Sequence, residues 1–311
     1  MFRIYSNKLK FLFLGLINAF LIVNIFLRLK FNNLKVCLCT NGKKENLYVR
    51  EYVEHYKKYG VDKIFIYDNN ELDGEHFEDV IFDYINTKFV EIINYRGLSS
   101  PQEIAYNDCR EKNYKKYNWL IFYDMDEYIY LRNYKNIKSF LNRRKFDKCQ
   151  RIQLNWVFHT DNNLIYYENK SLSERFTERE AIDRGKRIGG PKGIKSILRG
   201  NINLKISDVH ILNKNLTSCD GFGNIKEIHS IATNISDLKY YYIDHYYSKS
   251  TEEFINKIMR GSAVHGFNMN HKKRRIDVYF SINEVTLKKI EFIENKTNLN
   301  LSKFKNRIKN L

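Results

Sequence analysis

Three carboxylates fall within four residues directly after an apolar stretch of the chain. Residues 119–123 read Trp-Leu-Ile-Phe-Tyr, and Asp124, Asp126 and Glu127 follow at once. A short, wholly apolar run of this kind is typical of a strand that is buried on both faces. Ligands of open α/β sheets bind beyond the carboxyl ends of the strands, so we expect a polar site at this turn.

Asp124 and Asp126 have a spacing that suits metal binding. Alternate residues of an extended chain point to the same side, so both carboxylates can face one ion. Like charges this close repel each other unless a cation lies between them. Oxygen ligands suit hard ions, which predicts Mn²⁺ or Mg²⁺ together with a bound diphosphate. The Asp-x-Asp pattern also occurs in ordinary strand-to-loop turns, and the buried strand before it is what favours a functional site.

The residues before this turn indicate the elements that would position it. Strands are expected at residues 36–40, 64–67, 89–93 and 119–123, and helices at residues 45–59 and from Ser100 onward. Gly60 stands where a helix C-terminal cap belongs, and Ser100-Pro101-Gln102-Glu103 has the pattern of a capping box. Successive β-α-β units predict an α/β fold with a mostly parallel, Rossmann-like sheet flanked by helices.

The pattern changes after the acidic turn. Residues 151–158 alternate between polar and apolar, which predicts a strand with one exposed face. Residues 174–184 are dense in charge and are interpreted as a solvated helix face, and residues 187–193 as a flexible basic loop. Residues 250–253 predict a helix start with a capping box, and residues 271–311 are expected to be a basic helical tail.

Composition narrows the class of protein and its partners. The chain has 311 residues, of which 43% are hydrophobic, enough to bury one large α/β core. Its formal charge is +17, but Lys and Arg are spread along the chain rather than confined to one stripe, so no nucleic-acid partner is expected.

The five cysteines are odd in number and form no Cys-x-x-Cys pair. We therefore expect buried thiols rather than a zinc site or a complete disulfide set.

The N-terminal part carries an apolar run with basic residues on both sides. Residues 11–27 contain no charged side chain, and Lys10 and Arg28 flank them. The run has the short length of a membrane span, and no cleavage site of a signal peptide follows it. Basic flanks on both sides leave the orientation undecided. The expected order is a short tail (1–10), a transmembrane helix as anchor (11–30), a stem (31–35), a catalytic domain (36–270) and the C-terminal tail (271–311).

Several motifs occur in an order that resembles a known family. They are Glu45-Asn46, Gly60-Val61-Asp62, Tyr67-Asp68-Asn69, Gln102, Asn107-Asp108-Cys109, the stretch 119–127, Trp156-Val157-Phe158 and His245-Tyr246-Tyr247-Ser248-Lys249-Ser250. With these motifs, most of the chain resembles glycosyltransferase family 92 and the related family 2-like transferases of the GT-A fold. The Asp-x-Asp-Glu turn and the His-Tyr-Tyr-x-Lys-Ser segment are the most specific parts.

The resemblance implies an inverting transferase that moves a hexose, galactose-like, from a UDP-sugar to a hydroxyl group of a glycan or other acceptor. It also implies a divalent ion, Mn²⁺ or Mg²⁺, held by Asp124, Asp126 and His245. A structural histidine is the alternative interpretation of His245. The residues expected to bind the nucleotide-sugar donor are Thr40, Glu45, Asp68, Asp124 and Lys249.

The chemistry of this reaction adds two further groups of candidates. An inverting reaction needs a carboxylate that removes the proton of the acceptor hydroxyl. Asp161, Glu174 and Glu178 follow the acidic turn and are the candidates, and Asp161 is preferred because it follows a strand end. Lys257 and Arg260, with Lys249, are expected to stabilise negative charge on the leaving diphosphate.

Two other classes stay open on the sequence alone. A metal-dependent nucleotidyltransferase or nuclease can use the same acidic turn. A non-catalytic, basic, membrane-anchored binding protein would explain the charge but not the buried strand that ends in carboxylates.

The expected location follows from the anchor. In a eukaryote the anchor implies a type II protein with its catalytic domain in a Golgi-like lumen. In a bacterium it implies a catalytic domain at the cytoplasmic face of the membrane. The lumenal location is permitted by Asn-x-Ser/Thr sequons at Asn169, Asn215, Asn234, Asn295 and Asn300.

Overall fold

A computed structural model describes residues 34–99, 101–180, 193–227, 238–261 and 269–309. The expected membrane anchor and nearly all of the expected basic loop lie outside these residues. No helix in the described ranges is both long and apolar enough to cross a membrane.

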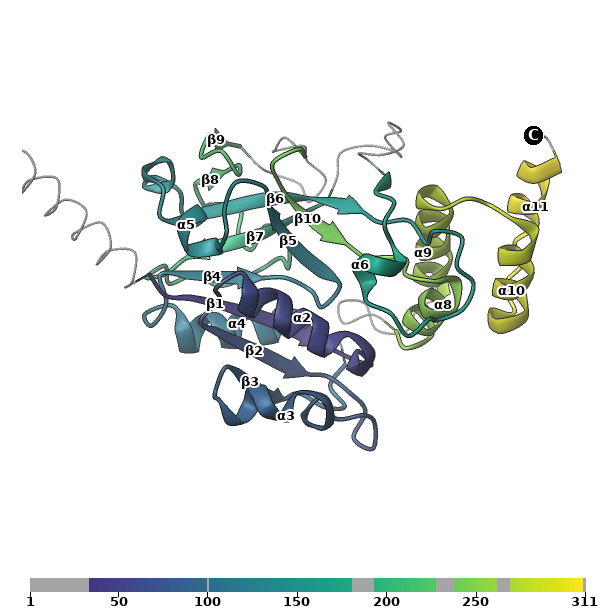
Figure 1. Ribbon diagram of the computed structural model, residues 1–311, viewed down its shortest axis with the longest axis horizontal. Coiled ribbons are helices and arrows are strands. Elements are labelled where there is room, and N and C mark those ends of the chain that lie inside the picture. Colours follow the sequence, from purple (N-terminus) through teal and green to yellow (C-terminus); the bar gives the residue numbers. More distant parts are fainter. Residues whose placement is uncertain (1–33, 100, 181–192, 228–237, 262–268, 310–311) are drawn as a thin grey trace, which may run out of the picture.

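A ten-stranded sheet forms the centre of the protein (Figure 1), with strand order β3-β2-β1-β4-β7-β6-β10-β5 and β8 and β9 alongside the start of β6. Its strands are β1 (Val36–Gly42), β2 (Lys63–Asp68), β3 (Val90–Asn94), β4 (Trp119–Phe122), β5 (Glu127–Leu131), β6 (Arg151–Phe158), β7 (Ile194–Arg199), β8 (Ser218–Cys219), β9 (Ile225–Lys226) and β10 (Tyr241–His245). The first four strands agree with the sequence-based expectation to within a few residues.

Helices cover both faces of the first half of the sheet. Val36 and Leu38 of β1 belong to one apolar cluster with α2 (Asn46–Lys58), and Cys37 and Cys39 belong to another with α4 (Gln102–Asn113). The remaining helix of this half is α3 (Glu78–Asn86), which packs beside α2. Burial on both faces is the reason these strands are apolar throughout, and it confirms the predicted α/β class.

The sheet is mixed, so the expectation of a mostly parallel sheet is wrong. Strands β3, β2, β1 and β4 are parallel, but β7 runs antiparallel between β4 and β6, and β5 runs antiparallel to β10. For β5 the physical reason is the acidic turn, where the chain enters β5 after four residues instead of crossing over through a helix. Because β6 and β4 are both antiparallel to β7, they point the same way, and β10 is parallel to β6. The carboxyl ends of β1, β2, β4, β6 and β10 therefore open on one edge.

Strand β6 is buried, which corrects the expectation of an exposed face. Its polar residues Arg151, Gln153 and Asn155 are buried, because β6 lies inside the sheet between β7 and the pair β10 and β8. Arg151 donates hydrogen bonds to the Ser218 hydroxyl and to backbone carbonyls, and Gln153 donates to Ser196. In β6, the polar residues of the alternating pattern make buried hydrogen bonds and do not form a solvent-exposed face.

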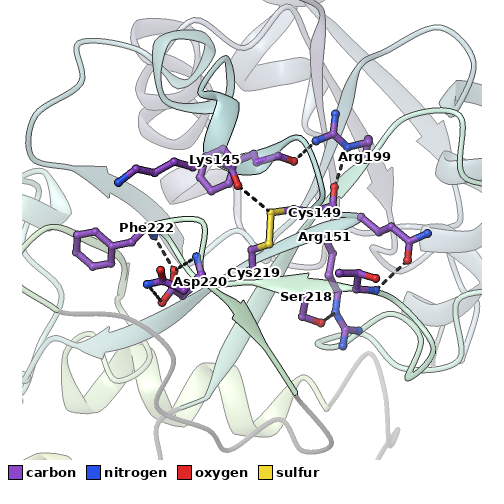
Figure 2. The surroundings of a disulfide bond; sticks show 12 residues. Lys145, Cys149, Arg151, Arg199, Ser218, Cys219, Asp220 and Phe222 are labelled. Atoms are coloured by element: carbon purple, nitrogen blue, oxygen red, sulfur yellow. Dashed lines mark hydrogen bonds between the residues drawn. A yellow bond between two sulfur atoms is a disulfide. The ribbon is translucent and has the colours of Figure 1, made fainter.

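Two disulfides join elements that are distant in sequence, contrary to the expectation of free thiols. Cys39 of β1 is bonded to Cys109 of α4, and Cys149 is bonded to Cys219 of β8 (Figure 2). Each pair is 70 residues apart in sequence and is brought together by strand pairing or helix packing, which spacing alone does not show. Cys37 remains a buried free thiol.

The C-terminal helices pack on the helix that follows β10. Helix α8 (Thr251–Met259) begins at the predicted capping box, in which Ser250 and Glu253 bond to each other's backbone. An apolar cluster joins it to the helices α9 (Met269–Ile282), α10 (Leu287–Thr297) and α11 (Ser302–Lys309). Shorter helices before α8 are α5 (Ile137–Leu141), η1 (Arg144–Phe146) and α6 (Leu172–Arg175).

We predict that replacing Cys149 and Cys219 together by serine lowers the free energy of unfolding by about 2–4 kcal/mol, because the unfolded chain gains the freedom that a closed loop removes. Denaturant unfolding of the oxidised protein and the variant measures the change. Peptide mapping without reduction should recover the two linked pairs and leave Cys37 alone reactive after unfolding. Alkylation of all five cysteines without reductant would contradict the pairing.

Candidate functional site

Asp124 is held at the end of β4 by side chains from two other elements. Its carboxylate accepts hydrogen bonds from Lys195 Nζ of β7 at 2.9 Å, from Tyr106 Oη of α4 at 3.1 Å, and from Gln102 of α4. Burial alone would raise the pKa of Asp124, but the fully buried ammonium of Lys195 outweighs it and keeps this pKa below its usual value. The Asp124 side chain is 31% exposed, so it remains open to a ligand.

Asp126 contacts other elements than Asp124 does, namely β10 and α8. Its carboxylate pairs with Lys257 Nζ of α8 and lies 3.5 Å from His245 Nε2 at the end of β10. The Asp126 carbonyl also accepts from the backbone N–H of Tyr246 at 2.9 Å. Burial opposes ionisation, but Lys257 and then His245 hold the pKa of Asp126 well below its usual range.

Glu127 supports the turn from inside the protein. Its Oε2 accepts the backbone N–H of Asp124 at 2.9 Å, and Lys195 Nζ lies 4.0 Å away. The side chain is fully buried. Burial raises the pKa of Glu127 well above its usual range, which favours the neutral acid. Glu127 therefore fixes the backbone that presents Asp124 and Asp126.

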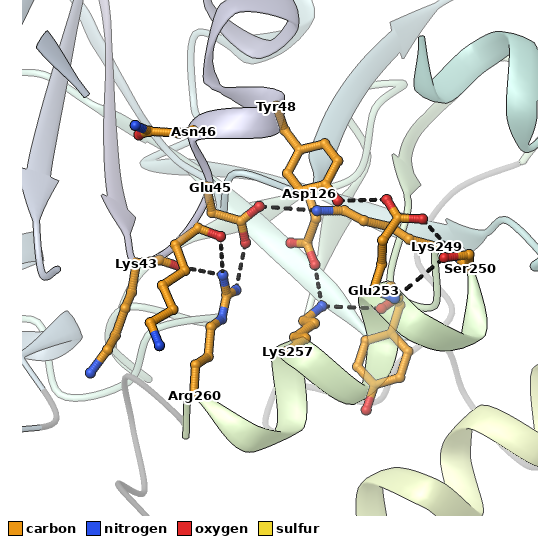
Figure 3. A network of polar contacts seen from close by, with 12 residues as sticks. Lys43, Glu45, Asn46, Tyr48, Asp126, Lys249, Ser250, Glu253, Lys257 and Arg260 are labelled. Carbon is orange, nitrogen blue, oxygen red and sulfur yellow. Dashed lines mark hydrogen bonds and ion pairs between the residues drawn. The ribbon is translucent and has the colours of Figure 1, made fainter. Parts of the chain in front are cut away.

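A second carboxylate, Glu45 at the start of α2, gathers two further cations beside Asp126 (Figure 3). It pairs with Lys249 Nζ at 3.0 Å and with the guanidinium of Arg260. Lys249 also lies over the ring of Tyr48, 3.1 Å from its centroid. Lys249, Lys257 and Arg260, which we call the α8 cation cluster, thus meet Glu45 and Asp126 at one place. Such a concentration of positive charge suits a phosphate-bearing ligand.

Thr40 and Asp68 lie at the carboxyl ends of β1 and β2, where the sequence suggested a nucleoside. Both side chains are buried. Asp68 accepts from Arg96 Nη1 at 2.7 Å and from the backbone N–H of Asn70 at 2.9 Å. Asp68 therefore orders the loops after β2 and β3, and Arg96 is the residue that sequence reasoning missed here.

The three carboxylates suggested as catalytic base are tied to other elements. Asp161 is buried and accepts from Lys289 Nζ at 2.7 Å and Tyr279 Oη at 2.6 Å, which are residues of α10 and α9. Glu174 closes the capping box of α6 on the protein surface, where hydrogen bonds from Ser171 lower its pKa. Glu178 accepts from the Thr160 hydroxyl at 3.2 Å. The contacts of Asp161 are those of a structural carboxylate.

Sequence reasoning also missed Lys195, although a signal was present. Lys195 is a single lysine among the mostly apolar residues of β7, and it is fully buried. A buried lysine requires a carboxylate partner. The acidic turn was the obvious partner, but nothing in the sequence pairs β7 with β4.

Asp124, Asp126 and His245 are suitable ligands for a divalent ion by chemical type. Two carboxylates and an imidazole fit Mn²⁺, and burial lowers the pKa of His245, which favours the neutral, ligating form. In the arrangement seen here, however, each carboxylate is paired with a lysine. Across the described ranges, no three His, Cys, Asp or Glu side chains are grouped as a metal site. A metal ion would therefore compete with Lys257 for Asp126.

Fold and site together define an α/β protein whose polar site, two carboxylates surrounded by cations, opens beyond the carboxyl ends of its strands. The chain belongs to glycosyltransferase family 92, whose family model matches residues 32–277. This match confirms the family that the sequence motifs resemble.

Similar proteins come from plants and bacteria. A glycosyltransferase family 92 protein of Arabidopsis thaliana is 23% identical over 242 residues, which cover 74% of this chain and 38% of that protein. One from Ricinus communis is 24% identical over 167 residues, covering 53% and 30%. The chain thus spans well under half the length of these relatives. S. aureus TarS in complex with UDP gives a TM-score of 0.36 at 12% identity, covering 79% of this chain and 71% of TarS.

We predict that Asp161→Asn lowers the free energy of unfolding by about 3–5 kcal/mol, because it leaves the buried ammonium of Lys289 without a counter-charge. Adding Lys289→Met should restore part of this loss. Denaturant unfolding of both variants measures it. An unchanged unfolding curve combined with a large fall in kcat would instead make Asp161 the catalytic base.

Proposed function

We propose that this protein is a glycosyltransferase that moves a hexose from a nucleotide sugar, a UDP-sugar, to a hydroxyl group of a glycan or glycoconjugate. The observation that carries the proposal is the acidic turn at the carboxyl edge of the sheet, with the α8 cation cluster beside it. Membership of glycosyltransferase family 92 supports the same activity. The alternatives of a nuclease or a non-catalytic binding protein have no comparable support.

The positions of the charged residues support one orientation of the bound donor in the site. The diphosphate would lie at the α8 cation cluster, since Lys249, Lys257 and Arg260 bring three positive charges to the site. The nucleoside would lie toward the ends of β1 and β2, beside Thr40 and Asp68. The hexose would then lie on the other side of β4, toward β6 and β10.

Transfer breaks the bond between the anomeric carbon and the diphosphate while the acceptor oxygen forms a new one. Negative charge grows on the leaving diphosphate, where Lys257 and Arg260 stabilise it. The acceptor hydroxyl gives its proton to a carboxylate, for which Asp161, Glu174 and Glu178 stay the candidates. Inversion at the anomeric carbon and a galactose-like hexose follow from the family resemblance and are part of the proposal.

We further propose that Asp124, Asp126 and His245 hold a divalent ion, Mn²⁺ or Mg²⁺. Such an ion, when bound, supplies Lewis acidity to the diphosphate. Lys257 then has two partners available, the Asp126 carboxylate and the donor phosphate. Their competition makes metal affinity and donor affinity separately measurable.

The location of the protein is also a proposal. Two disulfides favour an oxidising compartment, so we place the described domain in a lumen or outside the cell, with residues 11–27 as a membrane anchor. The sequon residues Asn169, Asn215, Asn295 and Asn300 are exposed, as glycosylation in a lumen requires. Residence in a reducing cytoplasm would count against this location.

The activity is tested by incubating the full chain with Mn²⁺ and a panel of UDP-hexoses and following release of UDP. We expect release to depend on one sugar and to increase with a glycan acceptor. Asp126→Asn should reduce the rate by about 100-fold or more, the size of effect typical for removing one charge-stabilising group. Release of nucleotides from a polynucleotide, with no UDP release, would instead make the protein a nuclease.

Lys257→Met should affect metal and donor in opposite directions. Removing the ammonium that pairs with Asp126 removes the competitor of the ion, so Mn²⁺ should bind about tenfold more tightly while UDP binds more weakly. Calorimetric titration with Mn²⁺ alone and with UDP alone measures both, and Lys43→Met is the control because Lys43 pairs with Glu71 instead. Wild type and Lys257→Met that both fail to bind Mn²⁺ would rule out the ion.

A further inference from the structure

Aromatic ring contacts run from His245, beside Asp126, through Trp156 of β6 to His210, near Asp124. His245, 3.5 Å from Asp126, packs against Trp156 of β6 with ring centroids 4.6 Å apart. Trp156 in turn packs against His210 at 5.4 Å. His210 lies close enough to Asp124 and Lys195 to interact with their charges. Trp156, His210 and His245, which we call the aromatic wall, therefore border the side of the acidic turn that faces β6 and β10.

The aromatic wall contains buried polar atoms that have no partner. Among the described residues, Trp156 Nε1, His210 Nδ1 and His245 Nδ1 are buried without a hydrogen bond. Buried polar atoms are nearly always satisfied, and each deficit destabilises the protein, so three deficits around one tryptophan need an explanation. An imidazole nitrogen can donate or accept a hydrogen bond, depending on the tautomer.

The position of the aromatic wall separates it from the proposed nucleoside side. Asp68 lies on β2, two strands from β4 in one direction, and Trp156 lies on β6, two strands from β4 in the other. A donor whose diphosphate sits at the α8 cation cluster would extend its nucleoside one way and its sugar the other. Trp156 and His210 are both partly exposed, so part of each ring is free to touch a ligand.

We propose that Trp156, His210 and His245 form the subsite for the hexosyl ring of the donor, an inference that rests on the proposed function. A hexose presents C–H groups on its faces and hydroxyls at its edge. The exposed part of Trp156 packs against a face, and Trp156 Nε1 and His210 Nδ1 bond to the hydroxyls. The sugar thus supplies the partners that Trp156 Nε1 and His210 Nδ1 lack, and the positions of these two nitrogens select among hexoses.

The experiment compares two ligands that differ only in the sugar. Full-length wild type, His210→Phe and Trp156→Phe are titrated with UDP and with UDP-galactose, UDP-glucose and UDP-N-acetylglucosamine in the presence of Mn²⁺. Each variant keeps a ring in place and removes nitrogen. We expect unchanged UDP affinity and about tenfold weaker binding of the preferred UDP-hexose, the size expected for lost hydrogen bonds. His76→Phe, which changes an exposed histidine, is the matched control and should alter neither titration.

Fluorescence gives a second measurement. The chain has two tryptophans, and Trp119 is buried in the core at 1% exposure. The preferred UDP-hexose should change the emission of wild type, UDP should not, and Trp156→Phe should abolish the change. Both variants should melt within a few degrees of wild type.

The outcomes separate this inference from the proposed function. If wild type binds UDP and the UDP-hexose, but both variants keep full UDP-hexose affinity, the hexosyl subsite is overturned and the proposed function stands. Equal losses for UDP and UDP-hexose would also overturn it, because the aromatic wall would then serve the phosphates or the fold. A change confined to the KM of the acceptor would move the subsite to the acceptor. Wild type that binds neither ligand would overturn both proposals.

Discussion

The two aspartates of the acidic turn, Asp126 buried and Asp124 partly buried, are paired with positive charge from elements far away in sequence. Lys195 of β7 serves Asp124, and Lys257 of α8 serves Asp126. These partners offset the effect of burial and keep the pKa of both aspartates below the usual value. The turn is therefore stable only once β7 and α8 have taken their places, so that completing the fold and assembling the site are one event.

The half of the fold that is built locally could be predicted from the sequence. The apolar runs of β1 to β4 and the apolar stripe of α2 can be recognised within each segment, and the capping box at Ser250 involves residues only three positions apart. The same local signal identified the acidic turn, because a buried strand ending in carboxylates lies within ten residues. Pairing of His245 with Asp126 was inferred through the resemblance, and the two side chains do lie beside each other.

Features that depend on pairing between distant segments were not predictable. The reversal of β7, the burial of β6 and both disulfides arise from strand order or from helix packing, which periodicity within one segment does not encode. Arg151 illustrates the point, since an arginine in an alternating strand indicates solvent until Ser218 is known to lie opposite it. Asp161 illustrates the converse, because its place after a strand end suggested chemistry while Lys289 gives it a structural partner.

Helix α8 contributes Lys257 to the site from one side and shares an apolar cluster with α9, α10 and α11 on the other. Phe254 of α8 stacks on Tyr279 of α9 with centroids 4.4 Å apart, and Thr251 bonds to the same tyrosine. The helix has little freedom to adjust to one surface without disturbing the other. Substitutions among the C-terminal helices would accordingly act from a distance on the proposed phosphate site. A comparison of natural sequence variants that considered only residues in contact with the ligand would miss such substitutions.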